Sequence, residues 1–235
     1  MSRPGDAAAP HGRMTGRSLA ITARGRRFVF FSAAASMVVL GMVGCRQGDE
    51  GPSSAAMRGL RGEVREIADP VPDFTLVDTA GRPFRFAREA RGYLTLLYFG
   101  YTQCPDICPV HLANLSAVLS DLPWDLRQRI RVVFVTTDPD RDTPSALRRW
   151  LDSFDPTFIG LSGSVEQINA AQARLGIPPL VREERGHGDY IVGHAAQMIA
   201  FTPDGRARVD YPFGTRQADW AHDLPLLAGS AGAGS

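Results

Sequence analysis

The chain has 235 residues, enough for one sizeable globular domain, with 44% hydrophobic and 22% charged residues. All 26 basic residues are arginine and the formal net charge is +1. Six arginines and one acid lie in residues 1–44, which leaves 20 basic and 24 acidic residues, a net charge of −4, in residues 45–235. A mildly acidic domain lacks the basic surface that binds nucleic acid, so we expect no nucleic-acid partner.

The N-terminal 44 residues have the composition of an export signal. Arginine-rich residues 1–27 precede the apolar residues 28–44, a stretch that is marginal for a transmembrane helix, which needs about 20 residues. The next residue is Cys45, and "MVGC" resembles a bacterial lipobox, in which the cysteine is lipidated. We expect a lipoprotein; the alternative is that residues 28–44 stay as an uncleaved anchor. Both predict a domain held at the membrane of a bacterial cell envelope, on its extracytoplasmic side.

The remaining elements can be predicted in chain order. Residues 45–68 are rich in Gly, Ser, Ala and charge, which is typical of a linker, and the domain proper is predicted to span residues 69–228. The expected elements are a hairpin over 74–86, a buried strand over 93–100, a helix over 110–122, a buried strand over 129–138, a helix over 143–154 with Thr143 as N-cap, a short strand over 157–163, a helix over 164–176, an irregular segment over 177–189, a hairpin over 190–214 with its turn at 203–205, and a helix over 215–227. Residues 229–235 are predicted to be a disordered tail.

Strands that alternate with helices, followed by an antiparallel hairpin, predict an α/β domain. Its mixed central sheet would be flanked by helices and preceded by an N-terminal β-hairpin. In this arrangement Cys104 and Cys108 lie in the loop after a central strand, at the N-terminus of a helix. Because that end of a helix stabilises negative charge, we expect the thiolate form to be favoured there.

The two cysteines could form a structural disulfide, a redox couple or a metal site. A bridge across three residues constrains little of the unfolded chain, which argues against a structural disulfide. The i, i+4 spacing can bring both sulfurs to one side of a first helical turn, which suits a chelate as well as a redox disulfide. Zinc normally takes four ligands, whereas two thiolates and one imidazole suit copper, especially Cu(I).

A copper site of this kind needs one histidine, and the chain has five. Four of them have ordinary explanations: His11 lies in the export signal, His111 and His222 are predicted at helix surfaces, and His187 lies in a glycine-flanked loop. His194 follows Gly193 at the mouth of a predicted strand, whose N-terminal end could face the cysteine loop. Spacing alone leaves the third ligand open.

Three segments carry a family resemblance. "GYTQCPDICP", "TTDPDRDTP" and "DYIVGHAAQMIAFTPDG" resemble the signature segments of the Sco/SenC family, membrane-tethered copper proteins that serve cytochrome c oxidase assembly. The resemblance covers most of residues 70–228. It implies a thioredoxin-like fold and copper, as Cu(I) or also as Cu(II), held by Cys104, Cys108 and His194, for delivery to the binuclear copper site of oxidase subunit II. An upstream copper donor and a thiol reductant are then further partners. The family usually has an acidic residue where this chain has Gly193, a departure that bears on copper affinity or docking.

The second segment contains two acids that match the family's "D-P-x-R-D-T-P". Asp138 ends a predicted central strand close to the expected site, so it is a candidate for contacting a copper ligand without binding the metal itself. For Asp142 we favour the ordinary explanation, a turn followed by a helix cap.

Two other functions use the same thiols. A thiol–disulfide oxidoreductase would reduce the cysteines of the oxidase site or of other extracytoplasmic proteins. A thioredoxin-type reductase usually has a proline facing its cysteines, but residues 193–197 contain none. A peroxide-reducing enzyme on the same fold would need a threonine and an arginine near its reactive cysteine, and the doubled Cys-Pro pairs do not match that pattern.

Overall fold

A computed structural model describes residues 57–186, 189–193 and 195–229 of the chain. The predicted export signal, Cys45, His187, His194 and the residues from 230 on lie outside the described residues. Within the described part, no helix has both the length and the apolar character needed to cross a membrane.

An eight-stranded mixed sheet forms the centre of the domain, in the order β1-β10-β9-β4-β5-β6-β2-β3. Its strands are β1 (Glu63–Pro70), β2 (Thr75–Asp78), β3 (Pro83–Arg85), β4 (Leu94–Gly100), β5 (Ile130–Thr136), β6 (Ile159–Ser162), β9 (Met198–Thr202) and β10 (Arg206–Tyr211). β4, β5 and β6 run parallel, and the other pairs are antiparallel. The mixed sheet and the N-terminal hairpin, here β2–β3, are confirmed.

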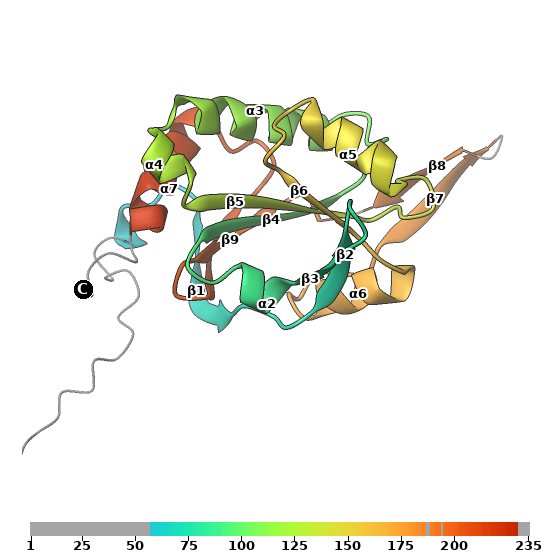
Figure 1. Cartoon of the computed structure of the whole chain (residues 1–235), viewed down its shortest axis with the longest axis horizontal. Coiled ribbons are helices and arrows are strands. Elements are labelled where there is room, and N and C mark those ends of the chain that lie inside the picture. Colours follow the sequence, from blue (N-terminus) through green and yellow to red (C-terminus); the bar gives the residue numbers. More distant parts are fainter. Residues whose placement is uncertain (1–56, 187–188, 194, 230–235) are drawn as a thin grey trace, which may run out of the picture. The chain divides into compact units, whose positions relative to one another are not determined.

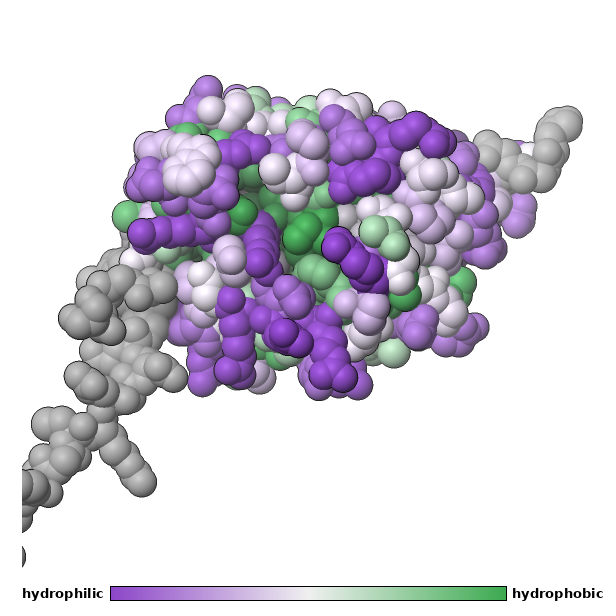
Figure 2. Space-filling view, in the orientation of Figure 1, coloured by the Kyte–Doolittle hydropathy of each residue, from purple (hydrophilic) through white to green (hydrophobic). Residues whose placement is uncertain are grey.

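Helices cover both faces of this sheet (Figure 1). They are α2 (Phe86–Glu89), α3 (Ile107–Asp121), α4 (Trp124–Arg127), α5 (Pro144–Asp152), α6 (Val165–Ala173) and α7 (Gln217–Gly229). Figure 1 shows α3 and α5 on one side and α2 and α6 on the other. In the same view, hydrophilic residues dominate the surface, and hydrophobic ones gather in a hollow near its middle (Figure 2).

The central strand β4 is buried along its whole length because both of its faces are covered. Leu96 and Tyr98 point into the core beneath α3, α5 and α7. Leu97 and Phe99 alternate with them and point into the core beneath α2 and α6. This alternation directs the Tyr98 ring toward α3, the helix that carries Cys108.

Local signals set the helix starts as predicted. The Thr143 side chain accepts a hydrogen bond from the Ala146 amide at 3.2 Å, and Pro144 is the first helical residue of α5. Ser164 and Gln167 form a reciprocal capping box at the start of α6.

The predicted linker boundary at residue 68 is wrong, because residues 63–68 belong to β1. This strand lies at the edge of the described sheet, next to β10. Its exposed and half-buried positions do not alternate, and Ile67 is 74% exposed. An edge strand of this kind leaves no period-two signal in the sequence.

The predicted irregular segment over 177–189 is also wrong in part. Residues 181–186 form β7 (Val181–Gly186), which pairs antiparallel with β8 (Asp189–Gly193) in a ribbon separate from the main sheet. Every side chain of β7 is exposed, so the strand has no hydrophobic pattern. The predicted hairpin over 190–214 is therefore divided: β8 pairs with β7, while β9 and β10 form the hairpin whose turn ends at Gly205 with φ +75°.

Candidate metal centre

The two cysteines lie where the sequence places them, between the end of β4 and the first turn of α3. Cys104 is 8% exposed and Cys108 is fully buried. The Cys108 amide donates a hydrogen bond to Cys104 Sγ at 3.4 Å. This amide belongs to the first turn of α3, where N–H groups have no carbonyl partner within the helix. Cys104 Sγ serves as the acceptor for one of them. The side chains of the two cysteines also hydrogen-bond to each other. The i, i+4 spacing therefore brings the two sulfurs together.

The end of β4 shapes the space around Cys108. A Cβ atom on Gly100 would lie 2.7 Å from Cys108 Sγ and 3.0 Å from the Phe134 ring, so only glycine fits at this position. The Tyr98 hydroxyl donates to Cys108 Sγ at 3.7 Å. The Cys108 sulfur is thus held between a glycine, a phenol and the neighbouring sulfur.

This environment raises the pKa of the Cys108 thiol. The causes are its hydrogen bond with Cys104, then burial, then the charge of the Cys104 sulfur. Cys108 therefore keeps its proton at neutral pH in the metal-free state. The expectation of a favoured thiolate is wrong for this residue, because desolvation and the second sulfur outweigh the helix terminus.

Asp142 fixes the loop that carries the cysteines. Its buried carboxylate accepts hydrogen bonds from the Thr102 amide at 3.0 Å, the Thr102 hydroxyl at 2.5 Å and the Thr136 hydroxyl at 2.6 Å. It therefore joins the cysteine loop to the end of β5. Thr143 caps α5 as predicted, and the Asp142 side chain bonds to residues of β5 and of the loop after β4.

Asp138 lies in the loop after β5 and is completely buried. Its carboxylate accepts a hydrogen bond from the Tyr190 hydroxyl at 2.8 Å and pairs with Arg141. Tyr190 belongs to β8, the strand that ends just before His194. Asp138 thus connects the central sheet to the ribbon that leads to the predicted third ligand.

The structure places the two described histidines, His111 and His222, in different environments, and one of them differs from the prediction. His111 is only 4% exposed, with its ring centroid 5.1 Å from those of Tyr98 and Trp220, so the surface assignment is wrong. The reason is that α7 covers this face of α3. His222 lies on α7, is partly exposed and hydrogen-bonds through Nδ1 to Asp223 at 2.8 Å. Among the residues that the structure describes, no group of three His, Cys, Asp or Glu side chains could hold a metal ion.

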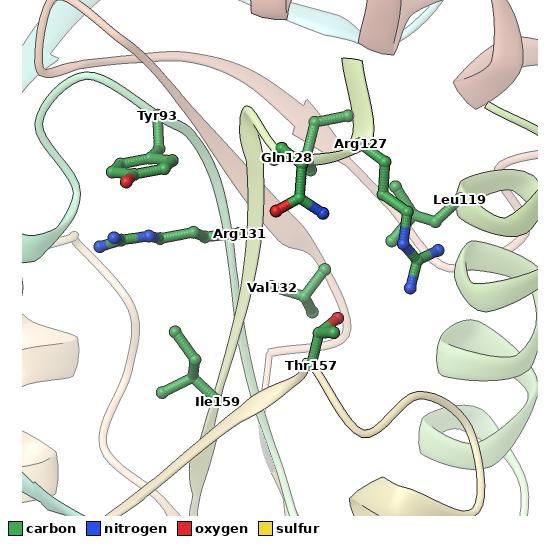
Figure 3. Close-up of a pocket in the computed structure, with 9 residues that line it drawn as sticks. Tyr93, Leu119, Arg127, Gln128, Arg131, Val132, Thr157 and Ile159 are labelled. Carbon is green, nitrogen blue, oxygen red and sulfur yellow. The ribbon is translucent and has the colours of Figure 1, made fainter. Parts of the chain in front are cut away.

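A surface pocket of about 250 Å³ lies elsewhere (Figure 3). Its lining includes Tyr93 and Arg131, whose guanidinium lies 3.5 Å from the centre of the Tyr93 ring. These residues stand near the starts of the parallel strands β4 and β5, whereas the cysteine loop follows the other end of β4. The pocket is therefore separate from the candidate metal centre.

Comparison with known proteins settles the family. The family model described as SCO1/SenC matches residues 62–228. This chain belongs to the SCO1/SenC family. Within this family, a Stutzerimonas stutzeri protein named as copper-binding is 37% identical over 138 residues, which cover 59% of this chain and 67% of the relative. The mitochondrial SCO2 homolog of Danio rerio is 37% identical over 144 residues, 61% of this chain and 51% of the relative. The matched segments thus span about half to two thirds of these curated SCO1/SenC relatives.

A solved member of the SCO1/SenC family has the same architecture. The structure of Bradyrhizobium japonicum ScoI with copper bound matches with a TM-score of 0.61 and 30% identity, covering 67% of this chain and 99% of that chain. The predicted thioredoxin-like fold, a mixed sheet flanked by helices, is confirmed. The predicted family is likewise confirmed.

Sequence reasoning missed three residues around the candidate metal centre: Tyr98, Arg141 and Tyr190. Tyr98 could have been found from strand alternation, since every second residue of β4 faces α3. Arg141 lies inside "TTDPDRDTP", but its partner Tyr190 is 49 residues away in the chain, and no local pattern joins them.

Proposed function

We propose that this chain is a copper-binding assembly factor that holds Cu(I) on Cys104, Cys108 and His194. The observation that supports this most strongly is the thiol pair: two cysteine side chains lie within hydrogen-bond contact at the start of α3. Soft sulfur donors favour Cu(I) over harder ions. The family's resemblance implies the same ligand set, and the copper-bound ScoI relative supports copper as the metal.

The protonation of Cys108 predicts how Cu(I) affinity depends on pH. A thiol must lose its proton to become a ligand, so binding releases the proton that Cys108 retains. Affinity for Cu(I) is therefore greater at higher pH. The hydrogen bond from Tyr98 to Cys108 Sγ helps to hold the sulfur after deprotonation.

Delivery follows from ligand exchange. Three ligands leave Cu(I) open to an incoming thiolate from the binuclear copper site of cytochrome c oxidase subunit II. Cys104 is the more exposed sulfur, and Cys108 is fully buried, so Cys104 is the ligand that the partner reaches first. The copper stays Cu(I) throughout, and each protein thiolate that leaves the metal is replaced by one from the partner. An upstream donor supplies copper, and a thiol reductant keeps both cysteines reduced.

The protein acts at the outer side of a bacterial membrane in this proposal. Lipid on Cys45, or the uncleaved residues 28–44, holds it there. If Cys45 carries lipid, radiolabelled palmitate enters the chain and is lost in Cys45→Ser. An unlabelled chain with an intact N-terminus would favour the uncleaved anchor.

A thiol–disulfide oxidoreductase remains the second candidate because of one observation. The hydrogen bond between the two cysteine side chains places both sulfurs within reach of a disulfide. In that function the chain would exchange its disulfide with cysteines of the oxidase site or of another extracytoplasmic protein, and His194 would be structural.

Substitution of the ligands tests the copper site. Cys104→Ala and Cys108→Ala are each expected to abolish stoichiometric Cu(I) binding, and His194→Ala is expected to weaken it while the fold persists. His222→Ala is the matched control, because this histidine is partly exposed on α7 and bonds to Asp223. Competition with a chromophoric Cu(I) chelator measures each affinity, and circular dichroism checks the fold. One tightly bound copper in either cysteine variant would refute the site.

A further inference from the structure

The β7–β8 ribbon stands apart from the main sheet, and its placement matters because β8 ends at Gly193. Among the strands that the structure describes, its two strands pair only with each other. Figure 1 shows the ribbon extending beyond the end of the sheet near α5. A two-stranded ribbon by itself is marginally stable in water. Contacts with the rest of the domain therefore decide where the end of β8 lies.

Tyrosine and arginine side chains supply one set of contacts. Over the Tyr190 ring lie two guanidinium groups, that of Arg141 at 3.7 Å from the centroid and that of Arg182 at 5.0 Å. Arg141 also lies 5.9 Å from the ring centroid of Tyr101, in the cysteine loop. We call these four residues the arginine–tyrosine stack. It connects the cysteine loop, the loop after β5, β8 and β7 through cation–π contacts.

Asp138 anchors this stack from inside the domain. Its buried carboxylate accepts the Tyr190 hydroxyl hydrogen bond at 2.8 Å and pairs with Arg141. A second arginine, Arg182, lies 3.9 Å from the same carboxylate and pairs with Asp140. A buried carboxylate is tolerated only when partners of this kind surround it. The hydrogen bond from the Tyr190 hydroxyl to the Asp138 carboxylate is charge-assisted and therefore strong, and it is lost when the hydroxyl is removed.

A second bond holds β8 two residues further on. The Val192 amide hydrogen-bonds to the Tyr101 phenol. The Val192 side chain is buried in the same core cluster as Cys104 and Cys108. Positions 190 and 192 lie on one face of the strand, and both contact the domain through that face. These contacts join β8 to the cysteine loop and to the acid behind it.

We propose that Tyr190 is a positioning residue, which with Asp138 and Arg141 seats β8 against the cysteine loop and so brings His194 to the two thiols. The copper part of this inference rests on the proposed function, because it takes His194 as the third ligand. The seating of β8 does not depend on copper. Tyr190 acts on the metal only through the strand that carries the histidine.

The variant Tyr190→Phe tests the seating in the reduced, metal-free full chain in detergent. It removes the hydroxyl and keeps the ring beneath the guanidinium groups. Tyr93→Phe is the matched control, since that ring also carries an arginine, Arg131 at 3.5 Å, but lies at the other end of β4. We expect hydrogen–deuterium exchange at residues 189–193 to accelerate in Tyr190→Phe alone, with β4 unchanged. Unchanged exchange at 189–193 would overturn the seating.

A double-mutant cycle then tests the action on copper. Cu(I) affinity is measured for the native chain, Tyr190→Phe, His194→Ala and the double variant. Loss of one hydrogen bond to a charged group predicts about tenfold weaker binding in Tyr190→Phe. The double variant should bind no more weakly than His194→Ala. The positioning role would be overturned if Tyr190→Phe weakened Cu(I) binding equally in the native chain and in His194→Ala, or weakened it in neither. Native affinity in His194→Ala would instead refute the proposed ligand set, and the exchange measurement would still decide the seating of β8.

Discussion

His111 is a buried imidazole three residues after Cys108. Burial lowers its pKa from 6.5 to about 4. Within the described part of the chain, neither of its ring nitrogens has a hydrogen-bond partner. Its neighbours are aromatic rings, among them Tyr98 and Trp220, which do not stabilise a charged imidazolium by ion pairing. His111 therefore acts as an aromatic core residue that can acquire a charge only at the expense of folding.

This lowered pKa predicts a loss of stability in acid. The unfolded chain binds a proton at His111 near pH 6.5, and the native chain does so only near pH 4. Between these values the unfolded state holds more protons, so stability falls as the pH is lowered. The full difference is on the order of 3 kcal/mol, from about 1.4 kcal/mol per pKa unit.

His111→Phe keeps an aromatic ring and removes the titrating group. Urea unfolding at pH 7 and pH 4.5 should show a smaller loss of stability in the variant than in the native chain. Carboxylates titrate in both proteins, so their contribution to the loss of stability cancels in the comparison. The same loss in the two proteins would contradict the assigned role of His111.

At the scale of elements, two glycines at strand ends have opposite surroundings. At the end of β4, a Cβ atom on Gly100 would meet Cys108 Sγ at 2.7 Å. At the end of β8, a Cβ atom on Gly193 would meet its nearest neighbour, the Val181 carbonyl oxygen, at 3.6 Å, an ordinary contact. The space at Gly193 therefore accepts a side chain, so the backbone does not demand a glycine in place of the acidic residue usual in the family.

Alanine substitutions at Gly100 and Gly193 are therefore expected to have different effects. Gly100→Ala should displace the Cys108 sulfur, destabilise the domain by about 1–3 kcal/mol through overpacking, and weaken Cu(I) binding. Gly193→Ala should leave the melting temperature close to that of the native chain. Thermal unfolding and Cu(I) competition measure both effects. A Gly100→Ala protein with native copper affinity would mean that the position of Cys108 is not set by the end of β4.

At the scale of the whole molecule, patterns that lie within one element could be predicted. The apolar run of β4, the Thr143 cap and the turn at Gly205 are local. The run of β4 and the helical spacing that follows it place the cysteines at the start of a helix. β1 and β7 could not be predicted, because exposed edge or ribbon strands have no hydrophobic alternation. β1 depends on pairing with the distant β10, whereas β7 pairs with its neighbour in the chain, β8.

The surroundings of the site depended on such long-range contacts too. His111 is buried because α7 packs on α3, and Asp142 bonds to Thr102, 40 residues earlier in the chain. The role of Tyr190 required β8 to be placed beside the loop that contains Asp138. The sequence could supply the two thiols and the family's histidine, but not the side chains that hold them in place.

The central claim is that the two thiols exist to hold copper. The most direct measurement is an anaerobic Cu(I) competition titration of the reduced full chain in detergent, together with the reduction potential of the Cys104–Cys108 pair. We predict one tightly bound copper per chain, lost when the pair is oxidised to a disulfide. Failure to compete for Cu(I), with a disulfide that is readily reduced, would contradict the copper function and assign the protein to the thiol–disulfide oxidoreductases.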